Sequence, residues 1–237
     1  MKLMYKYIIS LFLFFVFVSG FAQETEPLQT DLEKDSITYK TAYGLRLGLD
    51  ISKPIKSAVD GFYNSGLEFV GDYRISKRFY IAAELGYEDE TNQEDYSNSR
   101  AKGSYMRLGF NYNAYENWLD MNNEIFVGFR YGFSLFEQTL NSYTPNISNE
   151  YFPANTFTPN TTADLNAHWS EFMVGAKVET FNNLFVGFSL SYKIMISVKE
   201  QEGFKTLYAP GFNRIFDSGT GFGFNYTISY LIPFSKK

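Results

Sequence analysis

The chain has 237 residues, a formal net charge of −5 and no cysteine. The acidic balance argues against a nucleic-acid partner, which would need a basic surface, and the lack of cysteine excludes disulfides and a lipid-modified cysteine. Aromatic residues make up 19% of the chain although the mean hydropathy is only −0.24. This combination excludes a helical membrane protein and suits a membrane β-barrel, in which half of each strand faces lipid.

The first residues have the pattern of a secretory signal. Lys2 and Lys6 give a basic start, an apolar run follows from Ile8 to Val18, and Gly20-Phe21-Ala22 provides small residues near a cleavage site. The run is too short to span a membrane stably. We therefore expect a signal peptide at residues 1–22, a polar, acidic and disordered periplasmic tail at 23–40, and one barrel domain at 41–237.

Apolar and polar residues then alternate with a period of two, the pattern of a strand with one apolar face. In the last such segment, aromatic and aliphatic residues from Phe222 to Phe234 alternate with small residues such as Gly223 and Ser229. No residue on these apolar faces is charged, as expected if they meet hydrocarbon, where a mid-bilayer charge would cost about 2–4 kcal/mol. The eight predicted strands are residues 44–51, 67–75, 79–88, 105–112, 125–134, 171–179, 186–194 and 221–234.

The connections alternate in length. Those at Ser76-Lys77 and Phe181-Asn182-Asn183 are tight, and 115–123 is intermediate; the long, polar ones are 53–65, 89–102, 138–164 and 198–218. Short turns on one side and long loops on the other are typical of membrane barrels. We predict an all-β fold: an eight-stranded antiparallel up-and-down transmembrane β-barrel with short periplasmic turns, long extracellular loops and both termini in the periplasm.

Aromatic residues fall near the expected membrane interfaces, with Tyr87, Phe133 and Tyr192 on the extracellular side. A soluble secreted barrel or sandwich is the alternative, because the apolar face could also point inward. The glycines on the polar face, the interfacial aromatics and the aromatic last strand disfavour that alternative. The periplasmic group is Tyr43, Tyr73, Tyr112, Trp118 and Phe234. The expected C-terminal insertion signal is Tyr230, Ile232 and Phe234.

The polar faces would place six bases and seven acids inside the barrel. We expect Arg107 and Arg130, on adjacent strands, to lie near the centre of this network. Our interpretation is a salt-bridged plug, since buried charges need partners; a gated or proton-conducting path is the alternative. The last strand carries no inward charge and would close against the others. The network is Arg46, Asp50, Glu68, Asp72, Arg74, Glu84, Glu88, Arg107, Arg130, Glu171, Lys177, Glu179 and Lys193.

The extracellular loops carry aromatic residues, which either form a contact surface or fold back over the barrel mouth. The acidic run from Glu88 to Asp95, which includes Asp89, Glu90 and Glu94, suits a solvated loop or a weak divalent-cation site. The candidate contact residues are Tyr143, Tyr151, Phe152 and Phe157 in the third loop, and Phe204, Tyr208 and Phe212, with Leu207 and Phe216, in the fourth.

The single histidine, His168, lies close in sequence to Ser170 and Asp164. It shares parity with outward-facing Phe172 and Val174, which argues against a catalytic role at the barrel rim. No metal-ligand spacing, phosphate-binding glycine loop or nucleophile elbow is present in the sequence. We therefore expect neither enzymatic activity nor a cofactor.

The whole chain after residue 22 resembles small outer-membrane β-barrels of Gram-negative bacteria, of the outer-membrane protein A and X type in architecture. More closely, it resembles an uncharacterised family of such barrels. The segments that carry the resemblance are Gly66–Arg74, Tyr80–Gly86, Val127–Gly132 and Ser229–Phe234.

The resemblance implies a fold and a location but no activity. We expect a non-enzymatic structural or accessory subunit of an envelope complex, such as barrel-assembly or secretion machinery. Its partners would be outer-membrane lipid and lipopolysaccharide, other envelope proteins and, during biogenesis, the barrel-insertion machinery. The alternatives are a small channel or ligand-entry barrel and, less favoured, a lipid-modifying enzyme at the rim.

Overall fold

The structure is a computed structural model that describes residues 42–59, 64–115, 122–145 and 155–236. The predicted signal peptide at 1–22 and tail at 23–40 lie outside these residues, as do Trp118, Tyr151 and Phe152. Within the described part of the chain, no helix combines the length and apolarity needed to cross a membrane.

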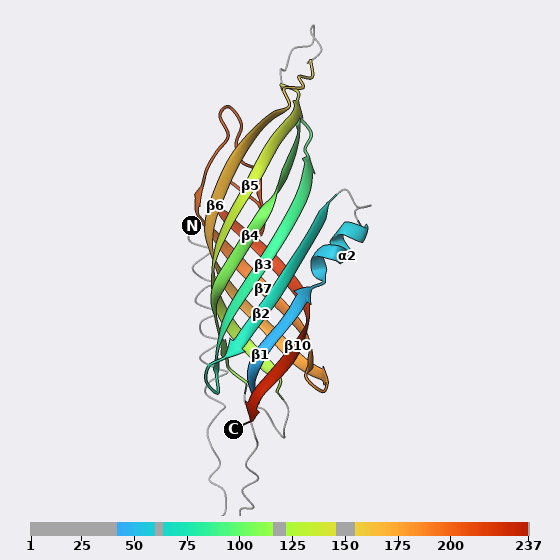
Figure 1. The fold of residues 1–237 in the computed structure, drawn as a ribbon. Helices are drawn as coiled ribbons and strands as arrows, with labels where there is room; N and C mark the ends of the chain where they lie inside the picture. The colour runs from blue at the N-terminus through green and yellow to red at the C-terminus, as the bar shows by residue number, and fades with distance from the viewer. Residues whose placement is uncertain (1–41, 60–63, 116–121, 146–154, 237) are drawn as a thin grey trace, which may run out of the picture. The chain divides into compact units, whose positions relative to one another are not determined.

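Eight strands close into one antiparallel barrel in the order β1-β10-β7-β6-β5-β4-β3-β2 (Figure 1). Each strand pairs with its neighbours along the chain, and β1 closes the ring against β10. The predicted up-and-down barrel is confirmed, with all eight strands in place. The strands are β1 (Ala42–Asp50), β2 (Ser65–Arg74), β3 (Phe79–Gln93), β4 (Ser97–Asn113), β5 (Glu124–Tyr143), β6 (Thr161–Phe181), β7 (Leu184–Val198) and β10 (Thr220–Lys236).

The predicted tight turns occur at one end of the barrel. The backbone N–H groups of Ile75 and Ser76 both donate to the carbonyl oxygen of Phe79, which closes the β2–β3 turn. The β6–β7 turn places Asn183 at φ 64°, a left-handed conformation that asparagine tolerates better than most residues. These turns, the start of β1 and the end of β10 all lie at the lower end in Figure 1.

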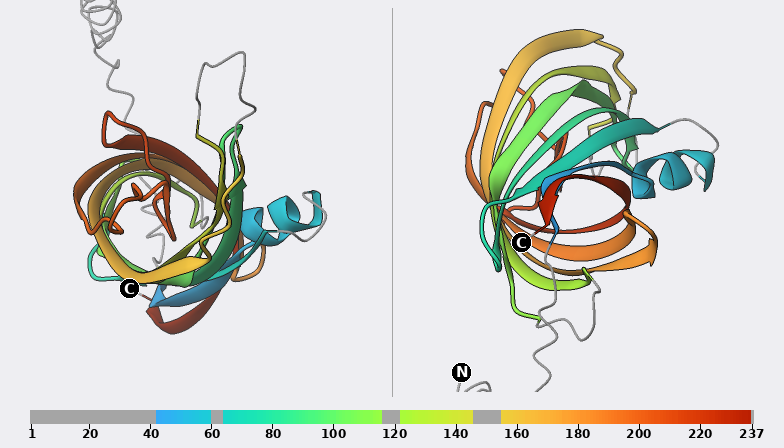
Figure 2. Two further views of the ribbon diagram at one scale, coloured as in Figure 1. Left: turned by 90° about the horizontal axis from the view of Figure 1, so that it is seen from above. Right: turned by 60° about the horizontal axis from the view of Figure 1, so that its bottom comes forward.

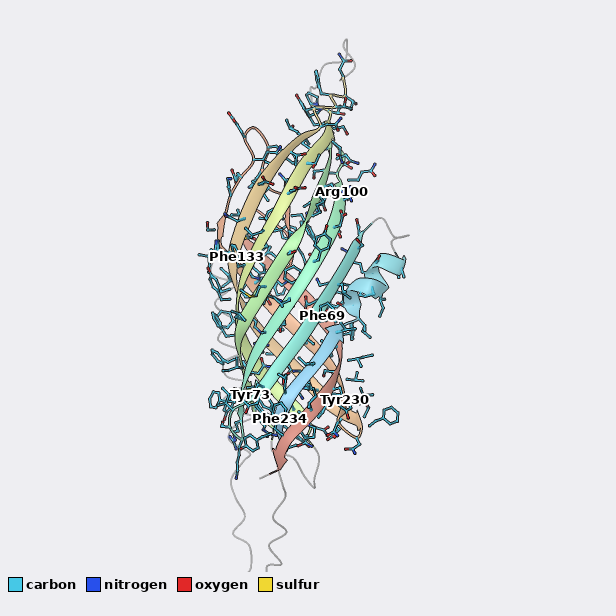
Figure 3. The ribbon with its side chains drawn as sticks, in the orientation of Figure 1. Phe69, Tyr73, Arg100, Phe133, Tyr230 and Phe234 are labelled. Carbon is cyan, nitrogen blue, oxygen red and sulfur yellow. The ribbon has the colours of Figure 1, made fainter. Side chains whose placement is uncertain are left out.

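An apolar belt encircles the outside of the barrel. In β5 its outward side chains run from Ile125 to Leu135 and are largely exposed, a length that fits the roughly 9–11 residues a tilted strand needs to cross a bilayer. The Tyr73 and Phe234 rings lie 6.5 Å apart at the lower end of this belt, the end at which Tyr230 also lies (Figure 3). Exposed apolar side chains arranged in this way are those of a transmembrane barrel, because water would strongly disfavour them.

Four strands, β3 to β6, continue well beyond the belt (Figure 1), and here two predictions need correction. The stretch 89–102, predicted as a loop, is a hairpin in which strand pairing continues to Gln93↔Asn98. The stretch 138–164, also predicted as a loop, is strand up to Tyr143 and again from Thr161. We call this extension the projecting region: residues 89–93 of β3, 97–103 of β4, 136–143 of β5 and 161–167 of β6.

The polarity of the faces inverts in the projecting region. Outward-facing Lys102 and Glu137 form an exposed salt bridge, whereas Ala101, Phe136 and Leu165 face inward and are buried. Apolar and polar residues therefore still alternate with a period of two, but the apolar residues now face inward and the polar ones outward. Water outside this region explains the reversal, since apolar side chains there are more stable inside.

Two connections carry further structure. The predicted loop 53–65 contains the helix α2 (Ser52–Val59), whose first N–H, at Ser52, donates to Asp50 Oδ1 at 2.8 Å. Helix α2 stands outside the barrel wall in the view from above (Figure 2). The predicted loop 198–218 contains a small hairpin of β8 (Tyr208–Ala209) and β9 (Asn213–Arg214).

Candidate functional site

The barrel interior is filled by two clusters of charged side chains. The lower cluster, towards the tight turns, consists of Arg46, Asp72, Glu124 and Lys177. Arg46 Nη2 donates to Asp72 Oδ1 and to Glu124 Oε1, both at 2.8 Å, and Lys177 also donates to Asp72. The guanidinium of Arg46 lies 4.7 Å from the centroid of the Phe185 ring.

The lower cluster includes one residue that the sequence analysis missed. Glu124 is buried and belongs to β5, but the predicted strand began one residue later, at Ile125. Its parity with Gly128 and Arg130 marks it as inward-facing, so extending the alternation by one residue would have found it. Without Glu124, Arg46 would have only Asp72 as an acidic partner.

The central cluster consists of Glu68, Glu84, Arg107, Arg130, Glu171 and Lys193. Arg107 contacts three carboxylates: it donates to Glu68, lies 2.8 Å from Glu84 without hydrogen-bond geometry, and reaches Glu171 at 3.1 Å. Arg130 Nε donates to Glu84 Oε1 at 3.1 Å. The structure thus places Arg107 at the centre of the interior charges, with Arg130 beside it.

Polar side chains complete the central cluster. Trp169 Nε1 donates to Glu171 Oε1 at 2.7 Å, and Tyr105 donates its hydroxyl to Glu68. From β10, which carries no inward charge, Asn225 Nδ2 donates to Asp50 Oδ2 at 2.5 Å and to Glu68 Oε1 at 3.3 Å. The last strand therefore closes against the charged strands through a neutral amide.

Two residues of the predicted interior network have hydrogen bonds to the turns at the lower end. Arg74 donates to the backbone carbonyls of Lys77, at 2.7 Å, and Ser76, at 3.3 Å. Glu179 is only half-buried and accepts hydrogen bonds from Asn122 Nδ2 at 3.0 Å and from the Asn183 N–H at 2.8 Å. Both residues bind groups of the turns at the lower end. Arg74 is buried in the interior, as predicted, and lines a small cavity together with Arg46 and Glu124.

Little space remains between the two clusters. A cavity of about 30 Å³ there is lined by side chains from both, including Asp72, Glu84 and Lys177, and has room for about a water molecule. The glycines of the inner face make this close packing feasible: a Cβ at Gly132 would lie 2.1 Å from the Trp169 ring. The interior is therefore a packed plug, as an eight-stranded barrel allows.

The β7–β10 loop folds into the upper mouth of the barrel, opposite the tight turns, and closes it. Tyr208, Ala209 and Phe212 are buried in an apolar cluster with Tyr105 and Trp169, among other side chains. In the view from above, this orange-red loop lies across the ring (Figure 2). The sequence left open whether the loop aromatics form a contact surface or fold back; Tyr208 and Phe212 fold back, so their prediction as external contact residues is wrong.

Glu88 fixes this loop from inside the barrel. Its Oε2 accepts hydrogen bonds from the Tyr208 hydroxyl at 2.8 Å and from the Gly211 N–H at 2.9 Å, and Lys193 Nζ donates to the Gly211 carbonyl at 2.6 Å. Burial, followed by the charge of Glu88, raises the pKa of Tyr208 well above its usual value, so the phenol stays a donor. Gly211, at φ 81° and packed against the Tyr105 ring, holds a position that only glycine fills without strain.

The other predicted contact aromatics remain nearer the surface. Tyr143 and Phe157 are exposed at the tip of the projecting region, with stacked rings whose centroids lie 5.3 Å apart. Phe204 is half-buried. The described third-loop candidates are therefore available for contact, unlike Tyr208 and Phe212.

The acidic run is neutralised by bases instead of forming a metal site. Asp89 pairs with Arg100, Glu90 with Lys56 at 2.8 Å, and Glu94 with Arg214 at 3.0 Å. The hydrogen bond and charge of Asp89 raise the pKa of Arg100. No group of acids and histidines that could hold a metal ion exists among the described residues.

His168 lies on the outer face of β6, as its parity predicts. Its Nδ1 lies 2.7 Å from the hydroxyl of Tyr131, and its ring lies 4.7 Å from the centroid of Phe133. The histidine therefore belongs to an aromatic group on the outer surface. This group holds no acid–base–nucleophile arrangement of the kind a hydrolase or transferase uses.

Comparisons with known proteins give a family match and distant structural likenesses. A family model described as "Domain of unknown function (DUF6048)" matches residues 4–237. No curated protein matches the chain. Among solved structures, the chain is similar to Ail, the attachment invasion locus protein of Yersinia pestis, with 8% sequence identity, a TM-score of 0.39, and coverage of 81% of this chain and 95% of that one.

Proposed function

Because the chain belongs to the family described as "Domain of unknown function (DUF6048)", we propose a function from the geometry of the barrel. The protein is a non-enzymatic integral outer-membrane β-barrel that acts as a structural or accessory subunit of an envelope complex. Barrel-assembly or secretion machinery is one concrete setting. The belt contacts outer-membrane lipid and lipopolysaccharide, and the projecting region contacts another envelope protein.

The closed interior is the observation that carries this proposal. Two ion-paired clusters occupy the membrane level, and the β7–β10 loop occupies the mouth, with Phe212 and Ala209 fully buried. A channel would need an aqueous path through this packing, and a rim enzyme would need a nucleophile and base directed at a shared pocket. A rigid, filled barrel is better suited to hold a binding surface in place.

The projecting region supplies that surface. Its strands rise above the belt with paired charges on the outer face, such as Lys102 with Glu137, and end in the exposed rings of Tyr143 and Phe157. Exposed aromatics surrounded by polar residues are typical of the centre of protein interfaces. A rigid sheet would also lower the entropic cost of docking.

Purification of a tagged copy at native level in a gentle detergent, followed by mass spectrometry, tests the proposal. We expect a defined envelope protein to copurify, and a photo-crosslinker at Phe157 to capture it. A crosslinker at Leu108, in the belt, is the matched control and should capture lipid or a different neighbour. Recovery of free barrel alone, with no crosslink from Phe157, would contradict the proposed subunit role.

Planar-bilayer recording distinguishes the proposed subunit role from the alternative of a small channel. The packed interior predicts no steady conductance, and sizeable steady conductance would favour the channel. A rim enzyme is tested by His168→Asn: unchanged envelope lipid profiles are expected, because the ring packs on the outer surface.

The C-terminal strand suits recognition by the barrel-insertion machinery. Tyr230, Ile232 and Phe234 are exposed on the belt face of β10. Phe234→Ser should reduce the amount of barrel inserted in cells while leaving refolding in detergent intact. Equal insertion of both proteins would contradict this role.

A further inference from the structure

The barrel wall has a lateral seam in its extracellular half, between β1 and β10. β1 ends at Asp50, paired with Thr227, and the last backbone hydrogen bond on this side runs from the Ile51 N–H to the Tyr226 carbonyl at 2.7 Å. β10 continues upward to Thr220 and is paired there only with β7, as far as the described residues show. Residues 220–225 of β10 therefore have an edge without a strand partner.

The sequence after Asp50 explains why β1 ends below the top of β10. Pro54 follows Asp50 after three residues; it has no N–H to donate to β10, and its ring favours the first turn of a helix. The chain turns outward there into α2, which stands beside the wall instead of completing it (Figure 2). Lys53 reaches back from α2 into the barrel, where it pairs with Glu88 and lies 3.9 Å from Glu68.

A pocket of about 550 Å³ lies at the seam, between α2, the loop and β10. This volume is within the range of small-molecule sites, roughly 300–1,000 Å³. Its wall combines cationic and amide side chains on the inner side with two aromatic rings on the outer side. The residues that matter most are Lys53, Lys56, Asn92, Arg214, Phe222 and Phe224.

The pocket is lined by three bases, Lys53, Lys56 and Arg214, and by two acids, Glu88 and Glu90. Glu88, an acid of the wall, already accepts hydrogen bonds from Lys53, Tyr208 and Gly211. The side-chain nitrogen of Asn92, Nδ2, is buried and has no hydrogen-bond partner, which is costly unless a ligand or water provides an acceptor. An acceptor-rich group would relieve that cost.

The two remaining cations are available to such a group. Lys56 pairs with Glu90 and Arg214 with Glu94, and both cations are more than half exposed. Ion pairs of this kind contribute little and are readily rearranged. An anionic oxygen in the pocket could therefore bind Lys56 and Arg214 without breaking a strong buried pair.

The outer side of the pocket belongs to the apolar belt. Phe222 and Phe224 are 78% and 60% exposed, against 41% for Ile228 lower on β10, where β1 flanks the strand. Phe222 packs near Tyr192, with ring centroids 5.1 Å apart, at the level where interfacial aromatics are expected. An acyl chain lying on these rings would occupy the flank that β1 leaves uncovered.

We propose that this lateral pocket binds the phosphate headgroup of an amphiphile from the outer leaflet, with its acyl chain lying along Phe222 and Phe224. Lys56, Arg214 and Asn92 Nδ2 bind the phosphate oxygens. The pocket opens sideways to lipid, so the ligand would enter from the membrane and not through the filled barrel. This binding is independent of the proposed subunit role and is tested separately.

Native mass spectrometry of the barrel in a neutral maltoside detergent provides the test, with dodecyl phosphate as the probe. We expect one dodecyl phosphate to remain bound per barrel. Inorganic phosphate at the same concentration tests whether the headgroup alone suffices, and dodecyl maltoside itself tests whether any chain suffices. Equal retention of either, or no bound dodecyl phosphate, would overturn the proposal.

Matched variants locate the site. Lys56→Gln with Arg214→Gln should weaken binding about tenfold or more, because charge-assisted hydrogen bonds are lost, and Asn92→Ala should weaken it less. Arg100→Gln with Lys102→Gln removes the same charge from paired, exposed bases outside the pocket and should leave binding unchanged. Heat-dependent gel mobility verifies that each variant is folded. Equal weakening by the two double variants would show general charge attraction and overturn the assignment.

Discussion

The membrane-level barrel and the projecting region share the same strands but place opposite kinds of side chain inside. In β5, Val127 faces out and Arg130 faces in at the level of the belt, whereas Glu137 faces out and Phe136 faces in above it. The backbone period is the same throughout, so the surrounding medium decides which face is apolar. Lipid outside leaves the interior to ion pairs, and water outside leaves it to an apolar cluster covered by the β7–β10 loop.

The two regions should respond most differently to loss of an arginine. Arg107→Met leaves Glu68, Glu84 and Glu171 buried without their shared partner, and removing one partner of a buried ion pair costs about 3–5 kcal/mol. Arg100→Met, in the projecting region, removes an exposed pair that contributes about 1 kcal/mol or less. Urea unfolding in detergent micelles measures both; similar losses would contradict the difference in burial.

The second largest difference between the two regions should come from a charge introduced on the outer face. Leu108 lies in the belt and is exposed, so Leu108→Arg should destabilise the lipid-inserted barrel by about 2–4 kcal/mol. Thr162→Arg, on the outer face of the projecting region, should have no measurable effect because water solvates the charge. Unfolding from lipid vesicles is the measurement. If Leu108→Arg left the free energy of unfolding unchanged, residue 108 would not face the hydrocarbon of the membrane.

Loss of a side chain from the apolar cluster should unfold the β7–β10 loop without unfolding the barrel. Phe212→Ala removes a fully buried ring, a change that costs about 3–5 kcal/mol in a cooperative core. The Phe212 ring holds only the β7–β10 loop in place. We therefore expect rapid proteolysis between residues 199 and 219, while the barrel stays intact and its unfolding midpoint is nearly unchanged. Leu135→Ala, on the outer face of β5 at the upper end of the belt, is the control and should leave the loop resistant. Loss of the whole barrel in Phe212→Ala would mean that loop and barrel unfold together.

The smallest expected effect concerns the attachment of α2. Burial lowers the pKa of Lys53, but the carboxylates of Glu88 and Glu68 raise it by more, and the net shift is upward. Its contribution is therefore complete below the ordinary lysine pKa of about 10.4 and is lost as pH rises through the higher folded-state value. A spin label at Val59→Cys should stay immobile from neutral pH to about pH 10 and become mobile only above it.

The Lys53→Met variant provides the control for that titration. It removes the charge at every pH, so the label should already be mobile at neutral pH. A label that responds identically in both proteins would show that other groups hold the helix.

The sequence predicted the membrane-level barrel well and the part above the belt poorly. Eight alternating segments sufficed for the strands, and parity placed Arg107 and Arg130 inside, because the pleat leaves a strand only two faces. The interior role of Glu124 was missed because the predicted strand began one residue too late, at Ile125. Parity gives the face of a side chain but not its partner, so it did not show that Arg74 and Glu179 bind groups of the lower turns.

The projecting region was missed because alternation was interpreted with one polarity only. Residues 89–102 are polar on the outer face and were taken as a loop, although Ala101 and Phe136 keep the inward register. The burial of Tyr208 depends on long-range contact with Glu88, far away in sequence. No local pattern carries that information, and the sequence left folding back and surface contact equally open.

A cysteine scan along β5 tests the inversion of polarity most directly, because the natural chain contains no cysteine and each single substitution gives one label. In vesicles, outward positions 125–135 should react only with membrane-soluble maleimides, and outward positions 137–141 with a charged, water-soluble one. Inward positions 136–140 should be protected until Phe212→Ala releases the loop. Labelling of positions 125–135 by the water-soluble reagent would contradict a lipid-facing belt and the polarity switch that depends on it.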